Sequence, residues 1–114
     1  MRQDVKDLAD AMERGYRLVP KNCYAFFNDD LNLSHVPIDK INSACAMGHA
    51  LIGRNESDVS RLGYLFPILD DQRVEDPRNR LFGTLLFCAI NMLIHNYGWT
   101  TPRIIKWLRS HQND

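Results

Sequence analysis

The sequence predicts an all-α protein, a compact bundle of about five short helices around a central apolar helix over residues 79–97. Three observations predict this class. Apolar residues recur at helical spacing along most of the chain, strand-like alternation never exceeds a few residues, and residues 81–94 are apolar nearly all round. A chain of 114 residues can bury one hydrophobic core, so residues 1–114 are predicted to form a single helical domain.

The composition excludes several classes of protein. The formal net charge is +0, which excludes a global attraction to nucleic acid or to anionic membranes and leaves only local patches. The three cysteines lack the paired spacing of a disulfide framework, the N-terminus has no apolar leader, and the apolar run over 81–94 is too short to span a bilayer. A cytoplasmic protein without a membrane segment is therefore expected.

The first half of the chain predicts two helices. Over residues 4–16 one apolar stripe recurs at intervals of three and four, formed by Val5, Leu8, Ala9, Met12 and Tyr16. A loop through residues 22–37 follows, and Asp39 can cap a second helix over residues 40–51 that Gly53 stops. The small residues Ala44 and Gly48 give this helix a narrow face, which we expect to cross the central helix at short distance.

The second half predicts an amphipathic segment from residue 55 to Pro67, an exposed charged connection over residues 69–79, the central helix and a closing helix. Gly98 is predicted to end the central helix in the left-handed conformation. Thr101 and Pro102 fit the start of the closing helix, whose apolar face contains Ile104 and Leu108.

Cys45 and His49 form the sharpest local constellation for chemistry, because residues four apart share a helix face. A thiolate activated by an imidazole is a nucleophile, and the same pair could supply two zinc ligands. The alternative interpretation is a buried cysteine beside a half-exposed histidine, which the usual burial of free cysteine favours. A cysteine-dependent enzyme therefore stays a minor alternative.

No cofactor or metal site is predicted. The chain lacks the glycine-rich phosphate loops of nucleotide-binding proteins. The acidic clusters at residues 28–30 and 70–71 lack the ligand spacing of a calcium loop, and solvated turns account for them.

The leading functional hypothesis is a small non-enzymatic module that binds another protein, as a regulator, adaptor or inhibitor. Three observations favour it: the chain has enough apolar residues for a core, no complete set of catalytic residues is found, and exposed loops can determine binding specificity. Aromatic residues flanked by charge are typical interface anchors, although residues such as Phe26 and Phe27 are more often part of the core. The two candidate surfaces contain Tyr24, Phe26, Phe27, Asp29, Asp30, Asp70 and Asp71. A homodimer stays open, because short helices with surplus apolar faces often need a partner.

The alternative hypothesis is DNA binding by a helix-turn-helix. A helix, a glycine turn and a closing helix place Arg103, Lys106 and Arg109 at successive intervals of three, against phosphates or bases. Three basic residues are a weak footprint, and the sequence pI of about 6.9 lies well below the value above about 9 that nucleic-acid-binding domains favour. Nucleic acid is therefore ranked below protein as the partner.

Two short stretches also carry a resemblance. Cys45-x-x-Gly48 lies in a predicted helix, and far downstream residues 94–100 read Ile-His-Asn-Tyr-Gly-Trp-Thr before the closing helix. This arrangement resembles a group of small, mostly uncharacterised bacterial and phage proteins, in which a Cys-x-x-Gly-x-Leu helix precedes a Leu-Asn-Asp turn and a closing helix begun by Ser or Thr. Tyr97 stands where that pattern has aspartate. The resemblance implies a compact, phage-related helical accessory protein and no particular reaction.

Overall fold

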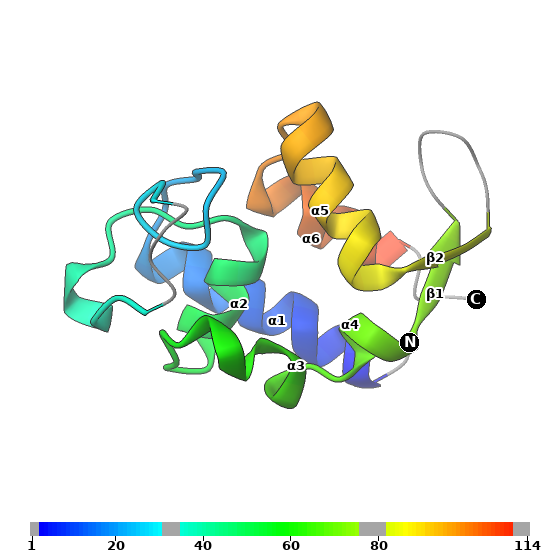
Figure 1. Cartoon of the computed structure of the whole chain (residues 1–114), viewed down its shortest axis with the longest axis horizontal. Coiled ribbons are helices and arrows are strands. Elements are labelled where there is room, and N and C mark those ends of the chain that lie inside the picture. Colours follow the sequence, from blue (N-terminus) through cyan, green and yellow to red (C-terminus); the bar gives the residue numbers. More distant parts are fainter. Residues whose placement is uncertain (1–2, 31–34, 76–81, 111–114) are drawn as a thin grey trace.

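The computed structural model describes residues 3–30, 35–75 and 82–110 and is mostly helical, with one small antiparallel sheet (Figure 1). Its elements are α1 (Gln3–Leu18), η1 (Ile38–Lys40), α2 (Ala46–Gly53), η2 (Val59–Arg61), α3 (Leu62–Leu65), α4 (Ile68–Asp71), β1 (Arg73–Glu75), β2 (Phe82–Leu85), α5 (Leu86–Tyr97) and α6 (Thr101–Ser110). The helical class is confirmed, but the fold is not purely all-α. None of the helices in the described ranges has the length and apolarity needed to cross a bilayer.

Helix α1 follows the predicted stripe and packs against both α2 and α6. Val5, Leu8 and Met12 are fully buried on its inner face. The helix runs on to Leu18, two residues beyond the predicted stripe, so Gly15 lies inside it. Gly15 is needed there for packing, because a Cβ at this position would lie 1.8 Å from the backbone oxygen of His49 in α2.

Helix α2 begins at Ala46, six residues later than predicted. Asp39 lies in η1, and Cys45 is the N-cap residue, whose Sγ accepts a hydrogen bond from the Gly48 N–H. The delay has a backbone cause. The preceding residue, Ala44, is extended and exchanges hydrogen bonds with the loop, donating to the Lys21 carbonyl at 3.0 Å and accepting from the Cys23 N–H at 3.1 Å.

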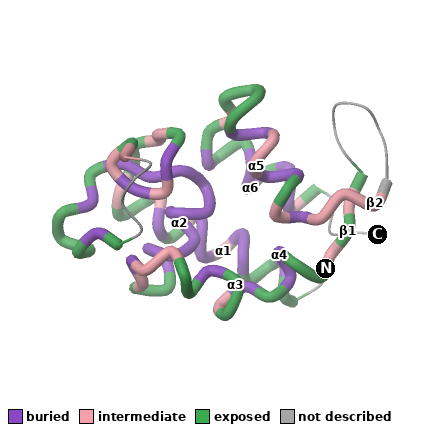
Figure 2. The backbone as a smooth tube through the Cα atoms, viewed as in Figure 1, coloured by how far each residue is buried: buried purple, intermediate pink, exposed green. Residues whose placement is uncertain are grey.

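The small residues of α2 do not cross the segment 79–97 as predicted. Instead α2 crosses α1, and α2 is buried along its whole length (Figure 2). The approach is reciprocal, because a Cβ at Gly53 would lie 1.9 Å from the Ala11 carbonyl oxygen of α1. Gly48 lies against the loop, where a Cβ would lie 2.1 Å from the Phe26 oxygen.

The predicted central helix over residues 79–97 is wrong in extent and in position. Residues 79–81 lie outside the described residues, Phe82–Leu85 form β2, and β2 pairs with β1 across an irregularity between Val74 and Glu75. Gly83 has φ +107°, which is incompatible with a helix. Helix α5 is a surface helix with one buried stripe, since Cys88, His95 and Tyr97 are exposed.

Other local predictions are confirmed. Pro67 lies just after α3, at the predicted end of the amphipathic segment. The exposed connection predicted over residues 69–79 is wrong in part, because α4 and β1 lie in this stretch and Leu69 is buried. Gly98 caps α5 with φ +65°, and its N–H donates to the Ile94 carbonyl at 3.0 Å. Helix α6 buries its apolar face, consisting of Ile104, Ile105, Trp107 and Leu108.

Candidate functional site

The predicted aromatic surface divides between core and solvent. Phe27 is fully buried, so it is a core residue and cannot anchor a partner. Tyr24 is 56% exposed, and Phe26 is half-buried and packs against the edge of the core. The accessible aromatic surface of this segment therefore comes from Tyr24 and Phe26.

Two residues of the neighbouring acidic segment build the turn. Asn28 and Asp29 have φ values of +57° and +55°, the left-handed conformation that Asn and Asp tolerate best after glycine. The Asp29 carboxylate accepts a hydrogen bond from the Tyr24 N–H at 3.2 Å, and the Asn28 side-chain amide donates to the Lys40 carbonyl at 3.0 Å. Asp29 thus stabilises its own loop. Asp30, the next residue, is half-buried.

The structure brings Phe26 and Asp70 together, although 43 other residues separate them in the chain. Both line a pocket of about 300 Å³, which we call the Phe26–Asp70 pocket. Its other lining residues are Val59, Leu62, Gly63, Leu69 and Phe87. One residue from each of the two predicted protein-binding surfaces therefore lines the same mainly apolar depression.

Asp70 is the one acidic residue among those that line this pocket. It is exposed, and within the described residues its carboxylate forms no hydrogen bond or ion pair. It lies close to Gly63, since a Cβ built there would lie 3.2 Å from the Asp70 Oδ2. Asp71, also exposed, is not part of the pocket lining. The pocket thus combines apolar walls with one uncompensated negative charge.

Cys45 and His49 do not form a nucleophile–base pair. The Cys45 thiol is buried and serves as the cap of α2, and burial raises its pKa to about 11. Such a thiol is protonated near neutral pH and is a poor nucleophile. The structure agrees with a buried structural cysteine, although the neighbouring histidine is fully buried where a half-exposed one was expected.

His49 instead ties α2 to α6 and to the end of α1. Its Nε2 lies 2.8 Å from the Val19 carbonyl oxygen, which can only accept, so this nitrogen carries the proton. Its Nδ1 therefore accepts the hydrogen bond from the Thr101 hydroxyl at 2.5 Å. Burial lowers the pKa of His49 to about 4, so the ring is neutral near pH 7.

A contact between a serine and a second histidine was not anticipated from the sequence. Ser57 Oγ lies 3.3 Å from the Nε2 of His35. The contact accompanies a backbone bridge between His35 and Asp58, and the Ser57 side chain is buried. This arrangement fastens the loop at residues 35–37 to the turn before η2, and the buried hydroxyl is poorly placed to meet a substrate.

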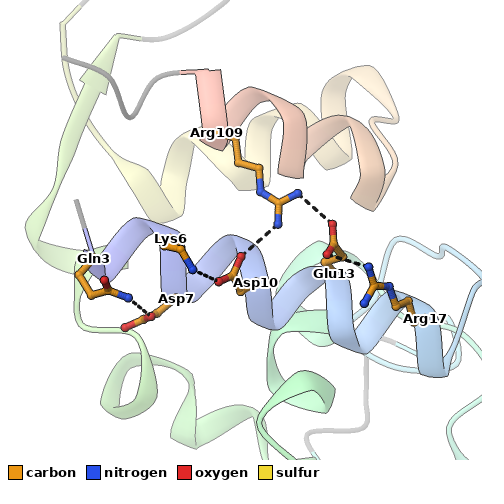
Figure 3. Close-up of polar contacts among 7 residues, drawn as sticks. All are labelled: Gln3, Lys6, Asp7, Asp10, Glu13, Arg17 and Arg109. Atoms are coloured by element: carbon orange, nitrogen blue, oxygen red, sulfur yellow. Dashed lines mark hydrogen bonds and ion pairs between the residues drawn. The ribbon is translucent and has the colours of Figure 1, made fainter. Parts of the chain in front are cut away.

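The three basic residues of α6 have different environments. Arg109 reaches across to α1, donating to the Glu13 carboxylate at 2.9 Å and to the Asp10 carboxylate at 3.1 Å (Figure 3). Arg103 lies over the Trp99 ring, 4.0 Å from its centroid, and Lys106 is exposed. Two carboxylates thus neutralise the charge of Arg109, which weakens the footprint expected for phosphate contacts.

Within the described ranges, no cluster of three or more His, Cys, Asp or Glu residues is arranged to hold a metal ion. No protein-family model, curated protein or solved structure matches this chain. The resemblance drawn from Cys45, Gly48 and the Gly98 turn stays a prediction, and the candidate site depends on geometry alone.

Sequence reasoning missed five of the pocket residues. Val59, Leu62 and Leu69 have the ordinary helical spacing of core residues, so nothing in the pattern marks them as pocket walls. Gly63 offered the one signal, because a glycine inside an amphipathic segment indicates a close approach by another group.

Proposed function

We propose that this protein is a non-enzymatic module that binds another protein through the Phe26–Asp70 pocket, as a regulator, adaptor or inhibitor. One observation carries the proposal. Two segments far apart in the chain, each with a residue predicted to bind a partner, line the same apolar pocket. Concave sites with apolar walls and a few polar groups are the usual places where proteins bind ligands or partner side chains.

The chemistry of the pocket selects a partner segment. Phe26, Leu62 and Phe87 offer apolar surface to one bulky aliphatic or aromatic side chain. The uncompensated Asp70 carboxylate favours a cation beside that side chain, because complementary charges steer and orient association. The expected partner segment therefore places a bulky apolar residue next to Lys or Arg.

A peptide library displayed on phage provides a direct test. The library is selected on the protein and counter-selected on the Gly63→Leu variant, whose new side chain projects toward Asp70 and fills the pocket. We expect the enriched peptides to share an apolar residue beside Lys or Arg. Isothermal titration calorimetry with one such synthetic peptide then measures the Kd for each variant.

Two neighbouring carboxylates provide the matched control. Asp70→Asn should weaken the peptide by about 3- to 10-fold, whereas Asp71→Asn should change the Kd by less than about twofold, because an exposed charge outside the pocket contributes little. Peptides that bind the Gly63→Leu variant as tightly as the natural protein would overturn the proposal. Equal effects of Asp70→Asn and Asp71→Asn would remove Asp70 from the site.

A further inference from the structure

A second concave surface, which we call the α1–α6 groove, lies between the first and last helices. Its volume is about 410 Å³, within the range of small-ligand sites. Tyr16, Pro102 and Ile105 form its apolar part. The groove shares no lining residue with the Phe26–Asp70 pocket, so the two are separate concave surfaces.

The apolar part of the groove is supported from below by buried contacts. The Tyr16 ring meets the His49 ring edge-on, with their centroids 5.2 Å apart. Thr101, which precedes Pro102, is held by His49 through its hydroxyl and by the Asn22 side-chain oxygen, which accepts from the Thr101 N–H at 2.8 Å. These contacts set Tyr16 and Pro102 in place before any ligand arrives, which reduces the entropic cost of binding.

Three cations line the groove, and two of them form ion pairs with carboxylates of α1. Glu13 is paired with both Arg17, at 3.0 Å, and Arg109, at 2.9 Å. The hydrogen bond from Arg109 lowers the pKa of the Glu13 carboxyl, so this residue stays ionised and matched. Figure 3 shows Arg109 reaching from α6 to Glu13 on α1, where Arg17 of the same helix also meets Glu13. Lys106 is exposed, lines the groove and has no ion pair within the described residues.

We propose that the α1–α6 groove binds a small amphipathic carboxylate. Its carboxylate pairs with Lys106, and its hydrocarbon part lies on Tyr16, Pro102 and Ile105. A monoanion matches a single available ammonium, whereas a phosphate dianion favours several converging donors. The lining residues carry three positive charges and one negative charge, so the groove also attracts anions as a whole.

Octanoate is a suitable probe, with two analogues that separate the parts of the proposal. Calorimetry should show saturable binding of octanoate, and amide NMR shifts should be confined to the neighbourhood of Tyr16, Ile105 and Lys106. Butyrate should bind at least about 10-fold more weakly, because it has four fewer methylene groups to bury. Octylamine keeps the chain and reverses the charge, so we expect it not to bind.

Helix α6 supplies the matched variants. Lys106→Gln should weaken octanoate at least about 5-fold, because it removes the ammonium that pairs with the carboxylate. Arg103→Gln removes an exposed cation of the same helix that does not line the groove, and should leave the Kd within about twofold. Gly63→Leu should also have no effect, which separates this test from that of the proposed function.

Several outcomes would overturn the inference. They are the absence of saturable octanoate binding, octylamine binding as tight as octanoate binding, and equal losses in Lys106→Gln and Arg103→Gln. Thermal unfolding of each variant without ligand checks that the fold is unchanged, and both substitutions lie on the solvent face of α6.

Discussion

Helix α1 meets its two neighbouring helices through opposite kinds of contact. Against α2 the backbones nearly touch, because Gly15 faces the His49 oxygen and Gly53 faces the Ala11 oxygen. Against α6 the helices are joined by side chains, through the Arg109 ion pairs with Asp10 and Glu13. A groove remains on the α6 side, whereas the α2 side is closed.

The two junctions of α1 differ in how tightly they pack and in how much of their surface solvent can reach. Close backbone packing at α1–α2 leaves no room for an added methyl group and buries every residue of α2. Long charged side chains at α1–α6 bridge the two helices and remain partly exposed. We therefore infer that the first junction resists change and that the second can accept ligands, which the following predictions test.

The largest expected effect is at the tight junction. Gly15→Ala would place a Cβ 1.8 Å from the backbone oxygen of His49, so the two helices must move apart. We expect a loss of about 3 kcal/mol or more in the free energy of unfolding, although alanine is the better helix former. Urea unfolding followed by circular dichroism measures this loss.

Gly63→Ala is the control for this prediction. The nearest obstacle at Gly63 is the flexible end of the Asp70 side chain, at 3.2 Å. The stability should change by less than about 1 kcal/mol, since the side chain can move aside. If Gly15→Ala lowered the free energy of unfolding no more than Gly63→Ala, the result would contradict a close backbone approach of α1 and α2.

An intermediate effect is expected from the buried histidine that links the two junctions. His49 has a pKa of about 4 in the folded protein and about 6.5 when unfolded, so the unfolded chain binds the extra proton between these values. Stability should therefore fall as the pH is lowered from 7 toward 4. By pH 5 the loss should be about 2 kcal/mol.

Urea unfolding at several pH values checks this dependence, with His49→Gln and His35→Gln compared at each pH. The slope should largely disappear in His49→Gln and persist in His35→Gln, because His35 is exposed. An unchanged slope in His49→Gln would mean that another group controls the acid sensitivity.

The smallest effect is expected at the ion pairs of the open junction. Arg109 and Glu13 side chains are 37% and 36% exposed, so solvent screens their attraction. A double-mutant cycle of Arg109→Gln and Glu13→Gln should give a coupling free energy below about 1 kcal/mol that declines with added salt. A coupling well above that range, insensitive to salt, would make this junction as important for stability as the glycine crossing.

Much of the fold could be predicted from local patterns. The α1 stripe, the apolar face of α6 and the left-handed cap at Gly98 all depend on residues within a few positions of one another. The pocket could be predicted only in part. Phe26 and Asp70 were singled out for their residue types, but their meeting depends on how α3, α4 and α5 pack around them.

By itself the sequence determined which segments form helices wherever periodicity and end signals agreed, because those signals act between near neighbours. The tertiary structure alone decided the segments whose patterns were ambiguous. The apolar run after residue 81 could form helix or strand, and its pairing with β1 and the backbone of Gly83 made Phe82–Leu85 a strand. Ala44 was likewise kept out of α2 by its hydrogen bonds to Lys21 and Cys23. Both choices depend on partners distant in the chain, which no local pattern contains.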